Sequence, residues 1–166
     1  MDENNNNQSS ILKERIKSSI IFKLFSIYKL PLAYITGLKV DTLTDEKCQT
    51  SVDYKYLNKN PFNSTYFAVL SMAAELSTGT LAFLSAGGLK SDIAFIITEI
   101  KGQFFKKATG KTIFICNEGD KLREAVLDAQ NSTSSREQIV HSYGYNKNGD
   151  SIANFEFKWS FKKKNI

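Results

Sequence analysis

The longest apolar stretch of the chain lies within residues 58–88, which read NKNPFNSTYFAVLSMAAELSTGTLAFLSAGG. Asn63 or Ser64 can serve as an N-cap and the glycine pair at 87–88 as a stop, so the pattern predicts a helix of about 22 residues. Apolar side chains occupy every face of this helix, and its one charge, Glu75, lies near the middle. Such a helix is either wrapped by other elements or crosses a membrane.

The polar content of this helix argues against a membrane span. Six serine and threonine residues lie between Ser64 and Thr80, together with Gly79 and the carboxylate of Glu75. A charged side chain in a span is costly, and the flanks lack the basic bias of a membrane segment. We therefore expect a helix buried inside a sheet.

The N-terminal region predicts a polar tail followed by an amphipathic helix. Residues 1–10 are Asn-rich and polar, which is typical of disorder, whereas residues 11–166 read as one domain. Residues 11–30 predict a helix that Pro31 ends or bends. Its apolar residues at helical spacing are Leu12, Ile16, Ile20, Leu24 and Ile27. We favour a helix packed on the edge of the domain over a basic helix that rests on a membrane surface.

Alternating patterns predict six strands. They cover residues 38–43, 47–56, 92–107, 111–117, 138–145 and 151–161, and a short helix covers 119–130. The third strand has apolar residues on both faces at its start, which predicts a central strand covered on both sides.

The last two strands predict a hairpin, because an Asn-Gly pair lies within the turn 147–150. In the closing strand five residues are expected to face the core: Ala153, Phe155, Phe157, Trp159 and Phe161. Antiparallel strands with one long apolar helix predict an α+β fold in which the sheet curls around that helix.

Composition adds little to the predicted fold and function. With 166 residues, 42% of them hydrophobic, the chain is long enough for one packed domain. The net charge of +5 fits an anionic ligand or an acidic membrane surface and is too diffuse to indicate nucleic acid. Cys48 and Cys116 fall inside strand patterns and read as buried thiols, although a disulfide stays open. No secretory signal is visible, which favours the cytoplasm.

Three segments resemble a known family. They are YKYLNKNPFNSTYFAVLSMAAELSTG, FFKKATGK and FEFKWSF, and together they resemble a bacterial branch of the hotdog-fold thioesterase superfamily close to the phenylacetate-type thioesterases. The resemblance covers roughly residues 20–162. It implies a hotdog domain that acts on acyl-CoA or acyl-carrier thioesters as a homodimer or dimer of dimers. Coenzyme A would be part of the substrate, and no separate cofactor or metal is implied.

Thioesterases of this type carry an Asn, then His-Gly-Gly at the helix start, then an acid further along. Asn60 lies six residues before Tyr66, and Glu75 lies nine after it, so the Asn and the acid match that spacing. Tyr66, Phe67 and Ala68 stand where the family has His-Gly-Gly. The resemblance implies that Glu75 is a general base or nucleophile, while the N–H of Phe67 would stabilise the oxyanion.

The predicted site combines one acid with polar and basic contacts. Glu75 is the catalytic candidate, and the predicted substrate contacts are Asn60, Tyr66, Phe67, Thr78, Lys106 and Lys107. The two lysines would reach the phosphates of coenzyme A. Because Phe67 and Glu75 are about 12 Å apart along one helix, both can act on one carbonyl only in a dimer.

Simpler interpretations stay open for several residues. Glu75 could pair with a Lys or Tyr across a dimer interface for structural reasons, and Asn60 could shape a turn. His141 is the only histidine, and we expect it to be structural. The alternative function is a non-catalytic module that binds an acyl chain or acyl-CoA. A dehydratase or hydratase on the same fold is less favoured. Such enzymes pair a His with an acid at the site, and His141 is the only histidine available.

Overall fold

The computed structural model describes residues 11–164 except 12, 15, 17–18 and 89–91. The predicted tail 1–10 and Leu12 therefore lie outside the described residues. The elements are α2 (Ser19–Lys29), α3 (Pro31–Thr36), β1 (Lys39–Leu43), β2 (Cys48–Val52), η1 (Tyr56–Asn58), α4 (Phe67–Ser85), β3 (Ile93–Phe104), β4 (Thr112–Cys116), α5 (Gly119–Gln130), β5 (Arg136–Asn146) and β6 (Ser151–Lys163). This order agrees with the prediction.

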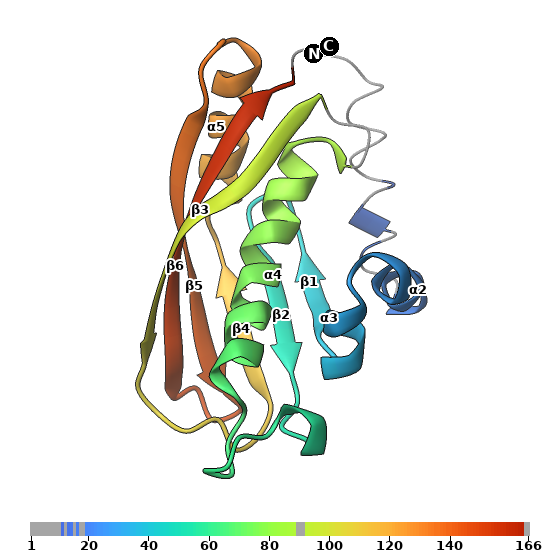
Figure 1. The fold of residues 1–166 in the computed structure, drawn as a ribbon, viewed down its shortest axis with the longest axis vertical. Helices are drawn as coiled ribbons and strands as arrows, with labels where there is room; N and C mark the ends of the chain where they lie inside the picture. The colour runs from blue at the N-terminus through green and yellow to red at the C-terminus, as the bar shows by residue number, and fades with distance from the viewer. Residues whose placement is uncertain (1–10, 12, 15, 17–18, 89–91, 165–166) are drawn as a thin grey trace.

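The six strands form one antiparallel sheet in the order β1-β2-β4-β5-β6-β3. Helix α4 runs along the inner face of this curved sheet, α5 packs beside it, and α2 with α3 lies to one side (Figure 1). The α+β class and the sheet curled around one helix are confirmed. The five predicted core residues of β6 are all buried, and Gly149, with φ 84°, forms the predicted turn before that strand.

Hydrogen bonds from hydroxyl groups join α4 to the sheet. Thr50 of β2 donates to the carbonyl of Ala73 at 2.6 Å, and the hydroxyls of Ser77 and Ser142 of β5 lie 2.8 Å apart. These bonds satisfy polar groups that would be costly to bury alone. Although α4 is long and apolar enough to cross a membrane, eleven of its residues are buried in the domain, so it is the core helix.

The start of α4 differs from the prediction. Asn63 and Ser64 both lie in the preceding loop, and the helix begins at Phe67 without a side-chain cap. Ser64 donates its N–H to Oδ1 of Asn60 at 3.2 Å, which holds it in that loop. Caps and loop turns use the same residue types, so the sequence could not separate them. At the other end Gly87, with φ 89°, follows the helix as predicted.

The second predicted strand is too long. β2 ends at Val52, and the chain then turns through η1 instead of continuing to Tyr56. Asn58 anchors this turn: it is fully buried and donates to the carbonyls of Thr36 and Asp53, both at 2.9 Å. A tertiary contact therefore overrides the local alternation.

The predicted central position of the third strand is wrong, because β3 lies at the edge of the sheet. Ile93 is buried at its start, but Ile96 is 64% exposed. Apolar residues on both faces therefore do not reflect two covered faces within this chain. Periodicity alone cannot show whether a second face is covered by the same chain or left exposed.

The N-terminal helical region is divided as predicted, since Pro31 starts the separate helix α3. The predicted apolar stripe faces inward only in part. Ile16 packs against the core and lines the cavity described below, while the side chain of Ile20 lies outside the described residues. Leu24 is 55% exposed and Ile27 is also exposed, whereas Ser26 is buried and Phe22 is partly buried. The helical region has apolar residues on more than one face, and spacing alone placed the outward Leu24 and Ile27 in one stripe with the inward Ile16.

The two cysteines lie opposite each other on neighbouring strands. Cys48 of β2 pairs in register with Cys116 of β4, and both are buried and free. Burial raises the pKa of both thiols, to about 11 for Cys116. They act here as small apolar side chains of the core.

Candidate active site

Glu75 faces an open apolar cavity of about 740 Å³. Helix α4 contributes Glu75, Leu76 and Phe83 to its wall, and β3 and β6 contribute Phe95 and Trp159. The opposite wall comes from the inner face of α2 and the chain around it. A volume of this size accommodates a small ligand, and its lining suits an acyl or aryl chain.

The carboxylate of Glu75 has no hydrogen bond or ion pair within the described part of the chain. Burial raises its pKa to about 7, because the charged form loses solvation among apolar neighbours. No Lys or Tyr pairs with Glu75 within the described chain. Structural pairing across a dimer interface, which the sequence left open, stays a prediction. An isolated carboxyl group that titrates near neutrality is suited to take up and release a proton.

Gly79 makes room for this carboxyl group one turn further along α4. A Cβ atom at Gly79 would lie 2.5 Å from Oε1 of Glu75 and 3.5 Å from the Trp159 ring. Glycine weakens a helix interior by about 1 kcal/mol relative to alanine. Its presence here lets the carboxyl group of Glu75 lie against the helix backbone.

Thr78 lies behind the cavity wall. Its side chain is fully buried, and its hydroxyl donates to the carbonyl of Glu75 at 3.0 Å and accepts from Nε1 of Trp159 at 3.3 Å. In this arrangement Thr78 positions the Trp159 ring that lines the cavity. The prediction that Thr78 contacts a substrate has no support from its position.

Four other predicted residues meet at the N-terminal end of α4. Asn60, Phe67, Lys106 and Lys107 line a smaller cavity of about 310 Å³. The loop before α4 and the segment after β3 run together here, since the N–H of Thr65 donates to the carbonyl of Ala108 at 2.8 Å. The structure thus brings these four residues together and places Glu75 at the other cavity.

Unpaired donors accumulate at this end of α4. The N–H groups of Phe67 and Ala68 have no acceptor among the described residues, and no side chain caps the helix. Thr65, which lines the same cavity, has a buried hydroxyl without a partner there. Free amides at a helix N-terminus attract anions and carbonyl oxygens.

The lysines near this cavity differ in their pairing. Lys106 binds Asp150 at 2.9 Å, whereas Lys107 has no ion pair in the described part of the chain. Lys101 and Lys111, further away, are both paired with acidic side chains. Lys107 is therefore the cation most available to a phosphate.

Asn60 stabilises the loop before α4 by hydrogen bonds, whereas Tyr66 lies at the start of the helix with its ring exposed. Oδ1 of Asn60 accepts from the N–H groups of Phe62 and Ser64 at 3.0 and 3.2 Å, so this side chain closes the loop at the cavity wall. Tyr66 is the N-cap residue, and its exposed ring packs edge-on against Phe67. Asn60 thus has the turn-forming role that the sequence left open.

The sequence did not predict the wall formed by α2. Phe22 and Phe25 of α2, together with Leu30 directly after it, line the cavity opposite Glu75, although the apolar stripe predicted for this region did not include them. The signal was present, because Phe22 and Phe25 are three residues apart and share a helix face. This helix has two apolar faces, and residue spacing alone does not show which of them is buried.

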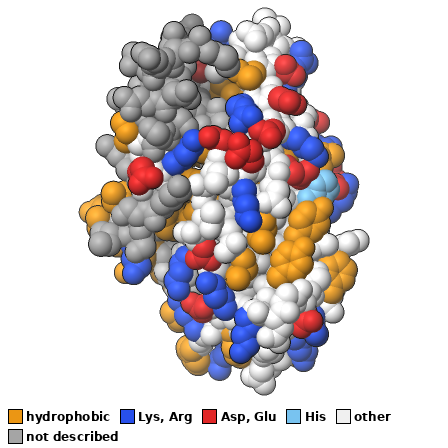
Figure 2. All heavy atoms as spheres, turned by 180° about the vertical axis from the view of Figure 1, so that it is seen from behind, with side chains coloured by type: hydrophobic (Ala, Val, Ile, Leu, Met, Phe, Trp, Pro, Cys, Tyr) orange, Lys and Arg blue, Asp and Glu red, His pale blue; other side chains and the backbone are white. Residues whose placement is uncertain are grey.

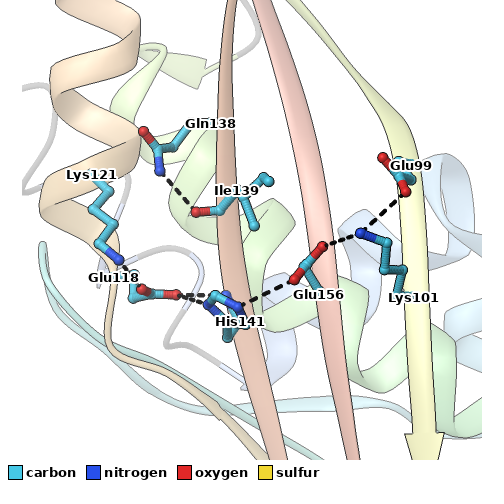
Figure 3. A network of polar contacts seen from close by, with 8 residues as sticks. All are labelled: Glu99, Lys101, Glu118, Lys121, Gln138, Ile139, His141 and Glu156. Carbon is cyan, nitrogen blue, oxygen red and sulfur yellow. Dashed lines mark hydrogen bonds and ion pairs between the residues drawn. The ribbon is translucent and has the colours of Figure 1, made fainter.

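His141 lies on the opposite side of the sheet from Glu75. Its neighbour Ser142 contacts α4, and successive side chains of a strand alternate between faces. Glu118 accepts from the His141 N–H at 2.5 Å and lies 3.1 Å from Nδ1, and Glu156 lies 3.6 Å from Nε2 (Figure 3). The histidine, pale blue in Figure 2, belongs to a charged network on the outer face.

The chain has the hotdog fold shared by thioesterase-like bacterial proteins. A Pseudomonas aeruginosa protein of unknown function, described as a thioesterase candidate, superposes with a TM-score of 0.72 at 17% identity, covering 93% of this chain and 95% of that one. A Chlorobaculum tepidum protein of unknown function gives 0.73 at 15% identity, covering 95% and 94%. A Haemophilus influenzae thioesterase gives 0.63 at 8% identity, covering 84% and 88%. No protein-family model and no curated protein matches the sequence.

Proposed function

We propose that this protein hydrolyses acyl-CoA or acyl-carrier thioesters, with Glu75 as general base. One observation carries the proposal: a carboxyl group without a partner in the described chain, with a pKa raised to about 7, faces an apolar cavity of about 740 Å³. At neutral pH about half of such groups are deprotonated, which suits general base catalysis. The fold shared with thioesterase-like proteins supports the same activity.

The reaction needs a base and donors for the developing oxyanion. Glu75 takes a proton from water, the hydroxide formed bonds to the thioester carbonyl carbon, and the tetrahedral intermediate then collapses. The C–S bond breaks, and the leaving thiolate takes up the proton held by Glu75. The amides of Phe67 and Ala68 would donate to the oxyanion, and Lys107 would bind a phosphate of the carrier.

The two halves of this site lie apart in one chain. Phe67 and Glu75 are eight residues, or about 12 Å, apart on α4. We propose a homodimer in which the α4 N-terminus of one subunit approaches Glu75 of the other. The edge strand β3 supports this proposal, because its backbone edge is unpaired by the described strands and Ile96, Ile100 and Phe104 are exposed along it.

The first test is hydrolysis of short, long and aryl acyl-CoA substrates by the wild type and Glu75→Gln. We expect the wild type to turn over at least one class, and the variant to lose about a hundredfold or more in kcat/KM. Glu124→Gln, a change at an exposed position on α5, is the matched control. Equal turnover by the wild type and a folded Glu75→Gln protein would rule out the proposed base.

Mixing two inactive variants tests the shared site. Phe67→Pro removes one amide, Glu75→Gln removes the base, and exchange of subunits forms mixed dimers. Each mixed dimer has one intact site if the amide and the acid come from different subunits, so about a quarter of wild-type activity returns. If each variant loses activity alone and the mixture regains none after exchange is verified, the shared site is wrong.

A second candidate function is a module that binds acyl-CoA without hydrolysing it. The observation that favours it is the replacement of His-Gly-Gly by Tyr66, Phe67 and Ala68, in which the exposed Phe67 ring lines the smaller cavity. Saturable binding of acyl-CoA by a wild type that hydrolyses none of the panel would establish this function in place of the first.

A further inference from the structure

Helix α2 has apolar side chains on two opposite faces. Phe22 and Phe25 point to the cavity, whereas Leu24, Ile27 and Tyr28, at i, i+3 and i+4, share the outer face. Leu24 is 55% exposed and Tyr28 is 83% exposed. A helix that is apolar on both faces needs a second covering surface.

The exposed surface continues onto α3. Pro31 starts this helix directly after α2, and Leu32, Tyr34 and Ile35 are all exposed on it. Apolar side chains gather at the left margin in Figure 2, the side on which α2 and α3 lie. We call Leu24, Ile27, Tyr28, Leu32, Tyr34 and Ile35 the outer apolar face.

The stretch of sequence that contains this face carries charges of one sign. From residue 15 to residue 40 the sequence contains five basic residues, Arg15, Lys17, Lys23, Lys29 and Lys39, and no acidic residue. Lys23 is exposed and has no ion pair among the described residues, whereas Lys29 lines the cavity and Lys39 pairs with Asp53 at 3.0 Å. The outer face of the sheet differs, because acidic and basic side chains alternate there (Figure 2).

We propose that the outer apolar face rests on a lipid surface rich in anionic headgroups. Apolar side chains enter the boundary between headgroups and acyl chains, while Lys23 binds a phosphate. Tyr28 and Tyr34 suit the same boundary because their rings are amphipathic. A second copy is a poorer occupant, since a face-to-face pair would bring Lys23 of both copies together, and α2 and α3 contain no acidic residue to oppose it.

This contact would also place the cavity at the lipid surface. The inner face of α2 contributes Phe22, Phe25 and Lys29 to the wall opposite Glu75. An acyl chain could then reach the cavity beside α2 without crossing bulk water. The lipid contact itself does not depend on whether a thioester is hydrolysed.

Co-sedimentation of the full chain with vesicles tests the proposal. We expect binding to phosphatidylcholine vesicles that contain phosphatidylglycerol, weaker binding to phosphatidylcholine alone, and a decrease as salt rises. The triple change Leu24→Ser, Ile27→Ser and Tyr28→Ser should lower partitioning about tenfold or more. Phe62→Ser with Leu127→Ser, which removes exposed apolar side chains elsewhere, should not lower it.

Lys23→Glu keeps the test decisive if the triple variant does not fold. It should lower binding to the anionic vesicles several-fold and leave binding to phosphatidylcholine unchanged. Absence of binding to anionic vesicles, equal binding to both vesicle types, or wild-type binding by the folded variants would overturn the proposal. A change of oligomeric state in the triple variant, measured by sedimentation velocity, would also overturn it and assign the face to a second copy.

Discussion

The two cavities along α4 have opposite chemical character. The smaller one lies at the helix N-terminus, where two amides and Lys107 have no partner among the described residues. The larger one, beside the middle of the helix, is apolar and contains one carboxyl group, that of Glu75. One can hold negative charge and the other can hold an acyl chain. A thioester of coenzyme A has both parts, which supports the proposal that the two cavities are complementary halves of a single site.

The largest expected effect comes from removing one amide. Phe67 is the first residue of α4, and proline is tolerated at that position because it needs no intrahelical partner. Tyr66 already has the extended backbone (φ −62°, ψ 136°) that a following proline requires. Phe67→Pro should therefore lower kcat about a hundredfold or more, whereas Phe67→Leu, which keeps the N–H, should not. Equal kcat values for the two folded variants would show that this amide takes no part.

The second effect concerns stability and pH. Glu75 has a pKa raised to about 7 in the folded protein, so the folded state binds its proton more tightly than the unfolded state. The free energy of unfolding should therefore fall as pH rises from about 4.5 to 7, by about 3 kcal/mol from this group. Glu75→Gln should abolish that part of the decline, which urea unfolding at several pH values measures. Glu124→Gln should retain the wild-type decline, and an unchanged decline in Glu75→Gln would contradict the raised pKa.

A smaller effect is expected at Gly79. Alanine there should favour the helix by up to about 1 kcal/mol, but its Cβ would displace the Glu75 carboxyl group. We expect Gly79→Ala to keep or raise the unfolding free energy while kcat/KM falls about tenfold. Ser85→Ala, in the last turn of the same helix, should leave kcat/KM unchanged. Wild-type turnover by Gly79→Ala would show that the present carboxyl position is not needed.

The smallest expected effect is on KM, and it distinguishes binding of the carrier from binding of the acyl chain. Lys107→Ala should raise KM for acyl-CoA about fivefold, because it removes one charge from a partly solvated phosphate contact. The KM for the matching acyl-N-acetylcysteamine thioester, which lacks those phosphates, should stay the same. Lys162→Ala, a change at an exposed position on β6, is the control. Equal changes for both thioesters would place Lys107 outside carrier binding.

Much of the fold could be predicted because local patterns agree with it. The order of elements, the turn around Gly149 and the inward residues of β6 all follow from periodicity and turn chemistry. The errors arise where a contact between residues far apart in the sequence determines the local backbone conformation. Asn58 holds the turn after β2 by donating to the carbonyl of Thr36. No property of residues 53–56 predicts that hydrogen bond.

The candidate site could be predicted only in part. Spacing identified Glu75 and grouped Asn60 and Phe67 near the start of the helix. It could not show that Thr78 faces Trp159, because which face of an all-apolar helix meets which strand depends on packing. It also missed Phe22 and Phe25, since α2 has two apolar faces of similar strength.

The sequence by itself determined an apolar central helix with one carboxylate, six strands and a basic apolar N-terminal helix, because these depend on the order of side chains alone. Only the tertiary structure decided that β3 is an edge strand, that α2 covers a cavity, and that Glu75 has no partner among the described residues. The physical reason is that the burial of a side chain depends on the residues that pack around it, and these can be far away in the sequence. The raised pKa of Glu75 depends on Trp159 and on α2, both remote from it in the chain.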